Sequence, residues 1–214
     1  MGYEASSLTN HVAAFGAFYS LGAVVATILL VVALHYLEPE FDPSWRMLSE
    51  YSLGEYGLIM RAAFILGGTG VTACGVALWP SAGLLAVGLP LVALGPIGAA
   101  FIDTDPITTP RSEMTGMSKA HAALGALFIL GFPVAATCAG IGASIHSEGG
   151  KVLAWMAVLP WAGLSWFLIA TIRSGSHSSI GNPDVRIGWP NRANMMAYMA
   201  WVALACVLTL VGAI

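Results

Sequence analysis

Charged residues are scarce in this chain. Its 214 residues include 8 Lys and Arg and 11 Asp and Glu, 9% in all, whereas soluble globular proteins carry roughly 25%. So few charges cannot cover the surface of a 22.2 kDa soluble protein. The same scarcity excludes a disordered chain, which needs high charge and low hydrophobicity. The net charge of −3 offers no basic patch, so we expect no nucleic-acid partner.

Cysteine is also rare. Cys74, Cys138 and Cys206 all fall within long apolar stretches, where a thiol behaves as a small apolar side chain. Their odd number and their spacing predict neither a disulfide framework nor a zinc site. The amino terminus lacks the positive segment of a signal peptide, and the apolar stretch that follows is long enough to span a membrane, so we expect no cleaved leader.

Long hydrophobic runs dominate what remains. Hydrophobic residues make up 57% of the chain, and the mean hydropathy is +0.80. A helix that crosses about 30 Å of hydrocarbon needs about 20 apolar residues. The run from Ala62 to Ile102 has 41 uncharged residues. As one helix it would be about 61 Å long, so it must fold back, and Trp79-Pro80-Ser81 with Gly83 close behind predicts the turn.

These runs predict an all-α polytopic membrane protein, a single bundle of six transmembrane helices. The predicted spans cover residues 13–37, 56–79, 82–102, 119–143, 152–172 and 193–213. Close helix packing is expected at small residues, namely the Gly67-Gly68 pair, Gly95, Gly98, Gly125 and Gly131.

Polar residues gather on one side of this predicted bundle. With six spans, both termini share one face, and the loops at 38–55, 103–120 and 173–192 share the other. Seven of the eight Lys and Arg lie on the loop face, and only Lys151 lies on the terminal face. The positive-inside rule then places the loops in the cytoplasm and both termini outside the plasma membrane. Either a functional site or simply the greater length of these loops explains the asymmetry.

Two acids stand where the third helix is expected to end. Asp103 and Asp105 would lie at the negative end of the helix dipole, where a carboxylate needs a compensating cation. The candidates for this cation are Arg61, Arg192 and Lys119. Arg61 lies inside the second span, where an ionisable group usually faces a partner or a wet cavity. Snorkelling to the headgroups is the alternative for Arg61. The acids predict either acid/base or cation-binding chemistry, or a turn cap ahead of Pro106.

His121 is the most promising base. It opens the predicted fourth helix just after Ser118, a plausible N-cap. The positive end of a helix lowers the affinity of an imidazole for a proton, which favours a neutral histidine acting as a base, a ligand or a structural hydrogen-bonding residue. A zinc site built from His35, His121, His177 and an Asp is possible, but it matches no known ligand spacing.

Ser49 is a candidate nucleophile. It lies in residues 42–54, which read as a short interfacial helix or re-entrant turn because Trp45 suits the headgroup layer. With His121 and Asp105 behind it, Ser49 would complete the arrangement of an acyl-transfer triad, although nothing in the spacing demands this.

Three segments carry a family resemblance. The first comprises Leu34-His35-Tyr36-Leu37-Glu38-Pro39, Leu48-Ser49-Glu50-Tyr51-Ser52-Leu53-Gly54 and Arg61-Ala62-Ala63-Phe64. The second is Phe101-Ile102-Asp103-Thr104-Asp105-Pro106, followed by Gly116 and His121. The third is Asn191-Arg192. Together they resemble the bacterial membrane family named domain of unknown function 998.

The resemblance implies a six-span bundle and no established activity. Family members commonly have Phe-Pro-Thr-Asp in the second segment, so Asp105 matches while Ile102-Asp103 departs. They also have Gln-Arg where this chain has Asn191-Arg192. Mapped residue by residue, the resemblance picks out Ser49, Glu50, Arg61, Asp105, His121 and Arg192.

Three functions stay open at this point. The favoured one is a membrane-embedded enzyme acting on a lipid or isoprenoid-like substrate, because a carboxylate, an imidazole and two guanidiniums converge on one face. Asp105 and His121 would exchange protons, with Ser49 as the nucleophile. The substrate's phosphate or carboxylate would be held at Arg61 and Arg192, beside Glu50.

The alternatives use the same residues differently. A small-solute or proton-coupled transporter would bind its cargo at this cluster. A non-catalytic subunit or assembly factor would use the cluster as an ion-pair lock, with a membrane-protein partner or as a homo-oligomer. In every case membrane lipids are the expected partners. No haem or flavin is expected, since no two histidines lie mid-span on facing helices, and no metal is expected, since no known ligand spacing is present.

Overall fold

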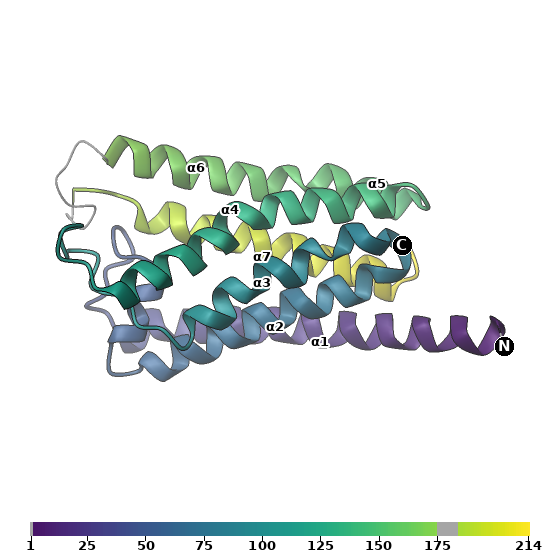
Figure 1. Ribbon diagram of the computed structural model, residues 1–214, viewed down its shortest axis with the longest axis horizontal. Coiled ribbons are helices and arrows are strands. Elements are labelled where there is room, and N and C mark those ends of the chain that lie inside the picture. Colours follow the sequence, from purple (N-terminus) through teal and green to yellow (C-terminus); the bar gives the residue numbers. More distant parts are fainter. Residues whose placement is uncertain (1, 175–183) are drawn as a thin grey trace.

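Helices make up nearly all of the ordered structure. The computed structural model describes residues 2–174 and 184–214, and within these ranges it contains no strand, which confirms the all-α fold. The helices lie side by side in an elongated bundle (Figure 1). In chain order they are α1 (Gly2–Leu37), the 3-10 helix η1 (Leu48–Leu53), α2 (Gly57–Ala82), the 3-10 helix η2 (Gly83–Ala86), α3 (Gly88–Ala99), α4 (Gly116–Ser144), α5 (Glu148–Met156), α6 (Val158–Ser174) and α7 (Gly188–Leu210).

Within residues 2–174 and 184–214, five stretches are long and apolar enough to cross a membrane. They are Leu8–Leu37, Gly57–Ala86, Gly116–Ser144, Glu148–Arg173 and Gly188–Leu210.

The predicted span at 82–102 contains the four residues of η2 and the 12 residues of α3, which is its longest helix. Within α3, Pro96 has no N–H to donate and the helix ends three residues later at Ala99. Because of this short helix, the count of six spans is not confirmed.

Proline and glycine also move two predicted boundaries. The turn predicted at residues 79–81 comes later, because α2 continues through Pro80 and the chain reverses at Gly83. Gly83 has a φ of 55°, a left-handed conformation that glycine adopts freely. The predicted span at 152–172 consists of two helices that meet at Ala157. The reason is Pro160, which has no N–H to offer the carbonyl four residues earlier.

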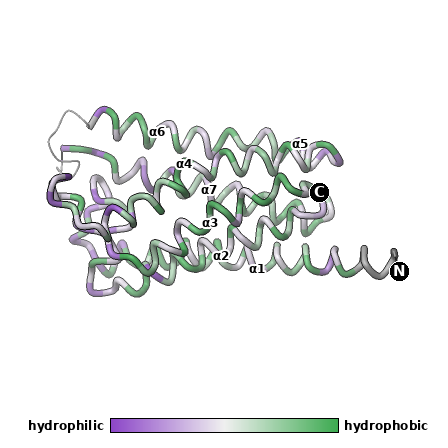
Figure 2. The backbone as a smooth tube through the Cα atoms, in the orientation of Figure 1, coloured by the Kyte–Doolittle hydropathy of each residue, from purple (hydrophilic) through white to green (hydrophobic). Residues whose placement is uncertain are grey.

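The two ends of the bundle differ in polarity. Figure 1 shows the N- and C-termini at one end and the connections at 38–56 and 100–115 at the other. Hydrophilic residues concentrate at this second end, called the loop end below, while the body is hydrophobic (Figure 2). The predicted grouping of polar loops opposite the termini therefore matches the arrangement of the chain. His177, which the sequence placed on the loop face, lies outside the described residues.

Packing is tight in the core and looser along one face of α4. Phe132 stacks on Tyr198 with ring centroids 4.4 Å apart, and both side chains are fully buried. At Gly95 an added Cβ would lie 2.5 Å from the carbonyl oxygen of Leu124, so only glycine lets α3 approach α4 there. Gly125 is different, because an added Cβ would meet nothing within 4 Å. The prediction that Gly125 mediates helix packing is therefore wrong, since its α4 face borders open space.

Candidate functional site

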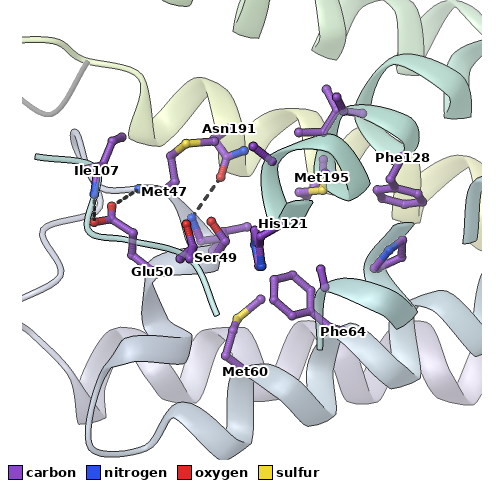
Figure 3. A pocket seen from close by; sticks show the side chains of 18 of the residues that line it. Met47, Ser49, Glu50, Met60, Phe64, Ile107, His121, Phe128, Asn191 and Met195 are labelled. Atoms are coloured by element: carbon purple, nitrogen blue, oxygen red, sulfur yellow. Dashed lines mark hydrogen bonds between the residues drawn. The ribbon is translucent and has the colours of Figure 1, made fainter. Parts of the chain in front are cut away.

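A large cavity occupies the loop end of the bundle. Its volume is about 890 Å³, within the 300–1,000 Å³ typical of ligand pockets. α1, α2, α3, α4, α6 and α7 all contribute to its wall, together with residues before α2 and between α3 and α4 (Figure 3). The apolar depth of the cavity is lined by Met60, Phe64, Phe128, Ile129, Phe167, Met195 and Met199.

Polar side chains meet at the end of the cavity that faces the loops, which we call the mouth. Four of the six predicted site residues line the cavity, namely Ser49, Glu50, Asp105 and His121. Arg61 and Arg192 do not line it. The other polar lining residues of the mouth are Thr104, Thr109, Arg111, Ser118, Lys119 and Asn191.

Glu50 ties the two loop segments of the mouth together. Its side chain is only 2% exposed, and its carboxylate accepts hydrogen bonds from the backbone N–H groups of Met47 at 3.0 Å and Ile107 at 2.9 Å. The guanidinium of Arg46 donates to the same carboxylate at 2.6 Å. Burial raises the pKa of Glu50 above its ordinary value, and these hydrogen bonds and the charge of Arg46 offset only part of the rise. Glu50 therefore holds together the two loop segments that form the mouth.

Asp105 anchors the beginning of α4. Its carboxylate accepts hydrogen bonds from the backbone N–H of Thr115 at 2.7 Å and from the Thr115 hydroxyl at 3.1 Å. Its own backbone N–H donates to the hydroxyl of Ser118 at 3.0 Å. The N-cap of α4 is Thr115 and not the predicted Ser118, because the Thr115 hydroxyl accepts from the Ser118 N–H. Asp105 thus acts on the helix terminus and forms no hydrogen bond to His121 among the described residues.

His121 presents a free ring nitrogen to the cavity. Its Nδ1 lies 2.7 Å from the carbonyl oxygen of Ile102, so this nitrogen carries the proton and donates it. Its Nε2 has no hydrogen-bond partner in residues 2–174 and 184–214. The ring also packs edge-on against Phe64, with centroids 6.0 Å apart. A neutral imidazole held in this way has its Nε2 lone pair available as a base.

Ser49 and Asn191 complete the uncharged part of the mouth. Figure 3 shows Ser49 and His121 directed toward the same space. No hydrogen bond joins them in the part of the chain that the structure describes, so the triad of Ser49, His121 and Asp105 stays a prediction. The side-chain oxygen of Asn191 accepts a hydrogen bond from the N–H of Leu48 at 3.1 Å. That bond orients the Asn191 amide toward the cavity that it lines.

Arg61 neutralises the end of α3 and lies outside the cavity lining. Its guanidinium forms an ion pair with Asp103 and donates a hydrogen bond of 3.0 Å to the carbonyl oxygen of Ala100. The predicted need for a cation at the negative end of this helix is therefore met by Arg61.

Arg192 is enclosed within the loop end. It is 6% exposed and lies in the first turns of α7, which begins five residues earlier than predicted. Its donors are used by the Nε2 of His35 at 2.7 Å, the carbonyl oxygen of Arg46 at 2.7 Å and the hydroxyl of Tyr51 at 3.3 Å. The hydrogen bonds of this guanidinium therefore connect α1, η1 and α7.

Two cations that the sequence did not single out for binding stand at the mouth. Arg111 and Lys119 line the cavity, are exposed, and have no ion pair among the described residues. No spacing signal separates them from Arg61, because all three lack an acid three or four positions away. Only the folded arrangement distinguishes the paired cation from the unpaired ones.

No metal-ligand set is assembled in the described ranges. Across residues 2–174 and 184–214, no three His, Cys, Asp or Glu side chains gather closely enough to hold an ion. His35 forms hydrogen bonds with Arg192 and with the carbonyl oxygen of Val31. Its ring is therefore neutral, and neither ring nitrogen is available to a metal. The alternative zinc site also involves His177, outside the described residues.

The helices and the cavity together define an all-helical protein whose apolar helices indicate multiple passes through a membrane. The chain belongs to the family described as protein of unknown function (DUF998), whose model matches residues 21–208. No curated protein and no solved structure matches the chain. The family match includes every residue that lines the cavity, and it confirms the resemblance seen in the sequence.

Proposed function

We propose that the protein is a membrane-embedded enzyme that binds a lipid or isoprenoid-like amphiphile in this cavity and acts on its headgroup. The single observation that carries the proposal is a cavity of about 890 Å³ with an apolar depth and a polar mouth. An amphiphile needs this division, because its hydrocarbon part gains about 25 cal/mol for each Å² that is removed from water. Its headgroup needs polar partners at the other end.

The mouth supplies the charges that an anionic headgroup needs. Arg111 and Lys119 are unpaired within the described residues, whereas Glu50 is neutralised by Arg46 and Asp105 is bonded to Thr115. We therefore assign the phosphate or carboxylate of the substrate to Arg111 and Lys119 in place of Arg61 and Arg192. The donors of those two arginines already serve Asp103 and His35, respectively.

Proton transfer would fall to His121. The bond from Nδ1 to Ile102 selects the tautomer in which Nε2 is an acceptor. From this position Nε2 can take a proton from the Ser49 hydroxyl or from a substrate hydroxyl. Glu50 and Asp105 act as positioning residues, since their carboxylates hold the loop and the α4 terminus around the mouth.

The proposal includes a membrane topology. We infer that η2 and α3 form a sixth crossing, which keeps both termini on one side and the mouth on the cytoplasmic side of the plasma membrane. A membrane-impermeant lysine reagent applied to intact cells tests this. Lys151 is expected to react from outside and Lys119 only after lysis; the opposite result would reverse the orientation.

Lipid analysis tests the function. We would compare a deletion strain of the native organism with the same strain expressing wild type, His121→Asn, His121→Ala or His146→Ala. His121→Asn retains an amide donor for the Ile102 carbonyl and lacks the base, and His146, exposed at the terminal end, is the matched control. We expect a lipid that changes in the deletion strain to be restored by wild type and by His146→Ala only.

Other outcomes are equally decisive. If His121→Asn restores the lipid, His121 is not the base and the catalytic proposal fails. If no lipid changes but a partner protein disappears from the membrane, the chain is a subunit or assembly factor. A small solute that accumulates in the medium or the cell without a lipid change would indicate transport.

A further inference from the structure

The contact between α4 and the α5–α6 segment is close at one level of the bundle. Near the terminal end, a Cβ added at Gly140 would lie 2.8 Å from the Cα of Ala154, so the backbones touch there. Further along, the indole N–H of Trp161 on α6 donates a hydrogen bond of 3.0 Å to the hydroxyl of Thr137 on α4. Trp161 is 43% exposed, so this seam between α4 and α6 lies at the outer surface.

Toward the loop end the same seam opens. Seven residues from Thr137 and from Trp161 lie Leu130 and Leu168, about 10 Å further along each helix and on the same helix face as that pair. Both leucines line the cavity, and both are exposed, Leu130 by 49% and Leu168 by 36%. Figure 1 shows α4 diverging from α6 in this direction. The cavity therefore reaches the side of the bundle between these two helices.

The α4 face that leads inward from this opening carries mainly small, apolar residues. Ala122, Gly125, Ala126 and Ile129 line the cavity with the helical spacing of a single stripe that ends at Leu130. An added Cβ at Gly125 would meet nothing within 4 Å, so the space beside this stripe is open. The stripe runs from the lateral opening to Lys119 and His121 at the mouth.

The opening lies between two apolar helical stretches. Leu130 lies within Gly116–Ser144 and Leu168 within Glu148–Arg173, two stretches apolar enough to cross a membrane. Leu127, three residues before Leu130, and Ile169, next to Leu168, are 44% and 48% exposed without lining the cavity, as expected for lipid-facing positions.

We propose that the gap between Leu130 and Leu168 is a lateral portal through which the hydrocarbon chain of an anionic amphiphile enters the cavity from the bilayer. The chain lies along the α4 stripe, and the headgroup stays at the level of Arg111 and Lys119. This inference rests on the proposed binding of a lipid in the cavity and is independent of whether the protein is an enzyme.

Photolabelling in a bilayer tests the portal. The full chain is placed in phosphatidylcholine nanodiscs, and a hexadecyl phosphate with a diazirine near the chain end is then added. Samples are irradiated briefly at increasing times after the addition, and adducts are mapped by mass spectrometry. In wild type we expect adducts on cavity residues such as Ile129 and Met195. Leu130→Trp, which places an indole at the portal, should slow this labelling severalfold, and the matched control Leu127→Trp on the same helix should not.

A second pair of variants keeps the test decisive if Leu130→Trp does not fold. Leu168→Ala removes a side chain from the portal and should speed cavity labelling, while Ile169→Ala beside it should leave the rate unchanged. Equal rates for portal and control variants, with the cavity still labelled, would overturn the portal and leave lipid binding intact. An unlabelled cavity in wild type would overturn both. Displacement of the probe by inorganic phosphate alone would show that free phosphate, and not a lipid, is the ligand.

Discussion

The Nε of Arg192 donates a hydrogen bond of 2.7 Å to the Nε2 of His35 and so joins α7 to α1 across 157 positions of the sequence. The other ring nitrogen of His35 lies 2.7 Å from the carbonyl oxygen of Val31, which it can reach only as a donor. The imidazole is therefore neutral and accepts from the guanidinium. Arg192 also holds the Arg46 carbonyl and the Tyr51 hydroxyl, so one side chain closes the loop end beside the cavity.

Removing this guanidinium should loosen the loop end. We expect Arg192→Ala to lower the free energy of unfolding by at least ~2 kcal/mol, because each buried acceptor left unpaired costs about 1–3 kcal/mol. Arg192→Lys should recover little, since an ammonium cannot reproduce the planar set of donors. Thermal unfolding in detergent measures the effect, with Arg186→Ala, at an exposed position, as the control. Equal midpoints for the Arg192 and Arg186 variants would contradict a stabilising role for the Arg192 hydrogen bonds.

Gly54 is expected to tolerate no larger residue. A Cβ at this position would overlap the carboxylate of Glu38, which is 1% exposed and accepts a hydrogen bond from the Tyr56 N–H. Overpacking of this kind costs about 1–3 kcal/mol, so Gly54→Ala should lower the unfolding midpoint. Gly22→Ala is the control, because an added Cβ on this exposed part of α1 meets nothing within 4 Å.

A double variant identifies the cause of the Gly54 effect. If the clash is with Glu38, Glu38→Ala combined with Gly54→Ala should be no less stable than Glu38→Ala alone. Additive losses in the double variant would instead place the strain in the backbone around Gly54.

Stability should depend on the protonation of Glu50. Burial raises the pKa of this carboxyl above its ordinary value, so the folded state binds a proton more tightly than the unfolded state does. The contribution of such a group is complete below its ordinary pKa and is lost as the pH rises through its folded-state pKa. We expect the unfolding midpoint of wild type to fall relative to that of Glu50→Gln between acidic and neutral pH. Glu55→Gln, at an exposed position nearby, is the control. A difference that grows in favour of wild type with rising pH would mean that the Arg46 ion pair outweighs burial.

Three cations of the loop end, Lys119, Arg111 and Arg61, should differ in their effect on binding of the hexadecyl phosphate probe. Lys119→Ala and Arg111→Ala should each weaken binding about threefold, because exposed ion pairs contribute about 0.2–1 kcal/mol. Arg61→Ala should leave binding unchanged, since that guanidinium is paired with Asp103 outside the cavity. Labelling by an uncharged hexadecanol analogue is the reference and should respond to none of these changes. If only Arg61→Ala weakened binding, the phosphate would bind at the end of α3 and not at Arg111 and Lys119.

Filling the cavity should block the probe without harming the fold. Gly125→Leu adds a side chain where an added Cβ meets nothing within 4 Å, and replacing glycine within a helix favours the helix. We therefore expect an unchanged or higher unfolding midpoint together with loss of cavity adducts. Gly22→Leu makes the same replacement on an exposed face of α1 and should retain the adducts. Persistent cavity labelling in Gly125→Leu would show that the chain does not lie along this face of α4.

The sequence by itself determined the class of the protein and the distribution of its charge. Long uncharged runs are enough to predict apolar helices, because hydrocarbon accepts no unpaired charge. A carboxylate at the carboxyl end of α3 is enough to predict a nearby cation, since the helix dipole acts over one turn. That prediction holds for Asp103 and Arg61.

The tertiary structure alone decided which polar groups remain available. Sequence spacing reports only neighbours a few positions apart, such as Arg46 and Glu50. The bonds that occupy Arg192 and that join Glu50 to Ile107 connect residues far apart in the chain, and helix packing sets them. For the same reason the sequence could not distinguish Gly95, which packs against α4, from Gly125, which borders the cavity.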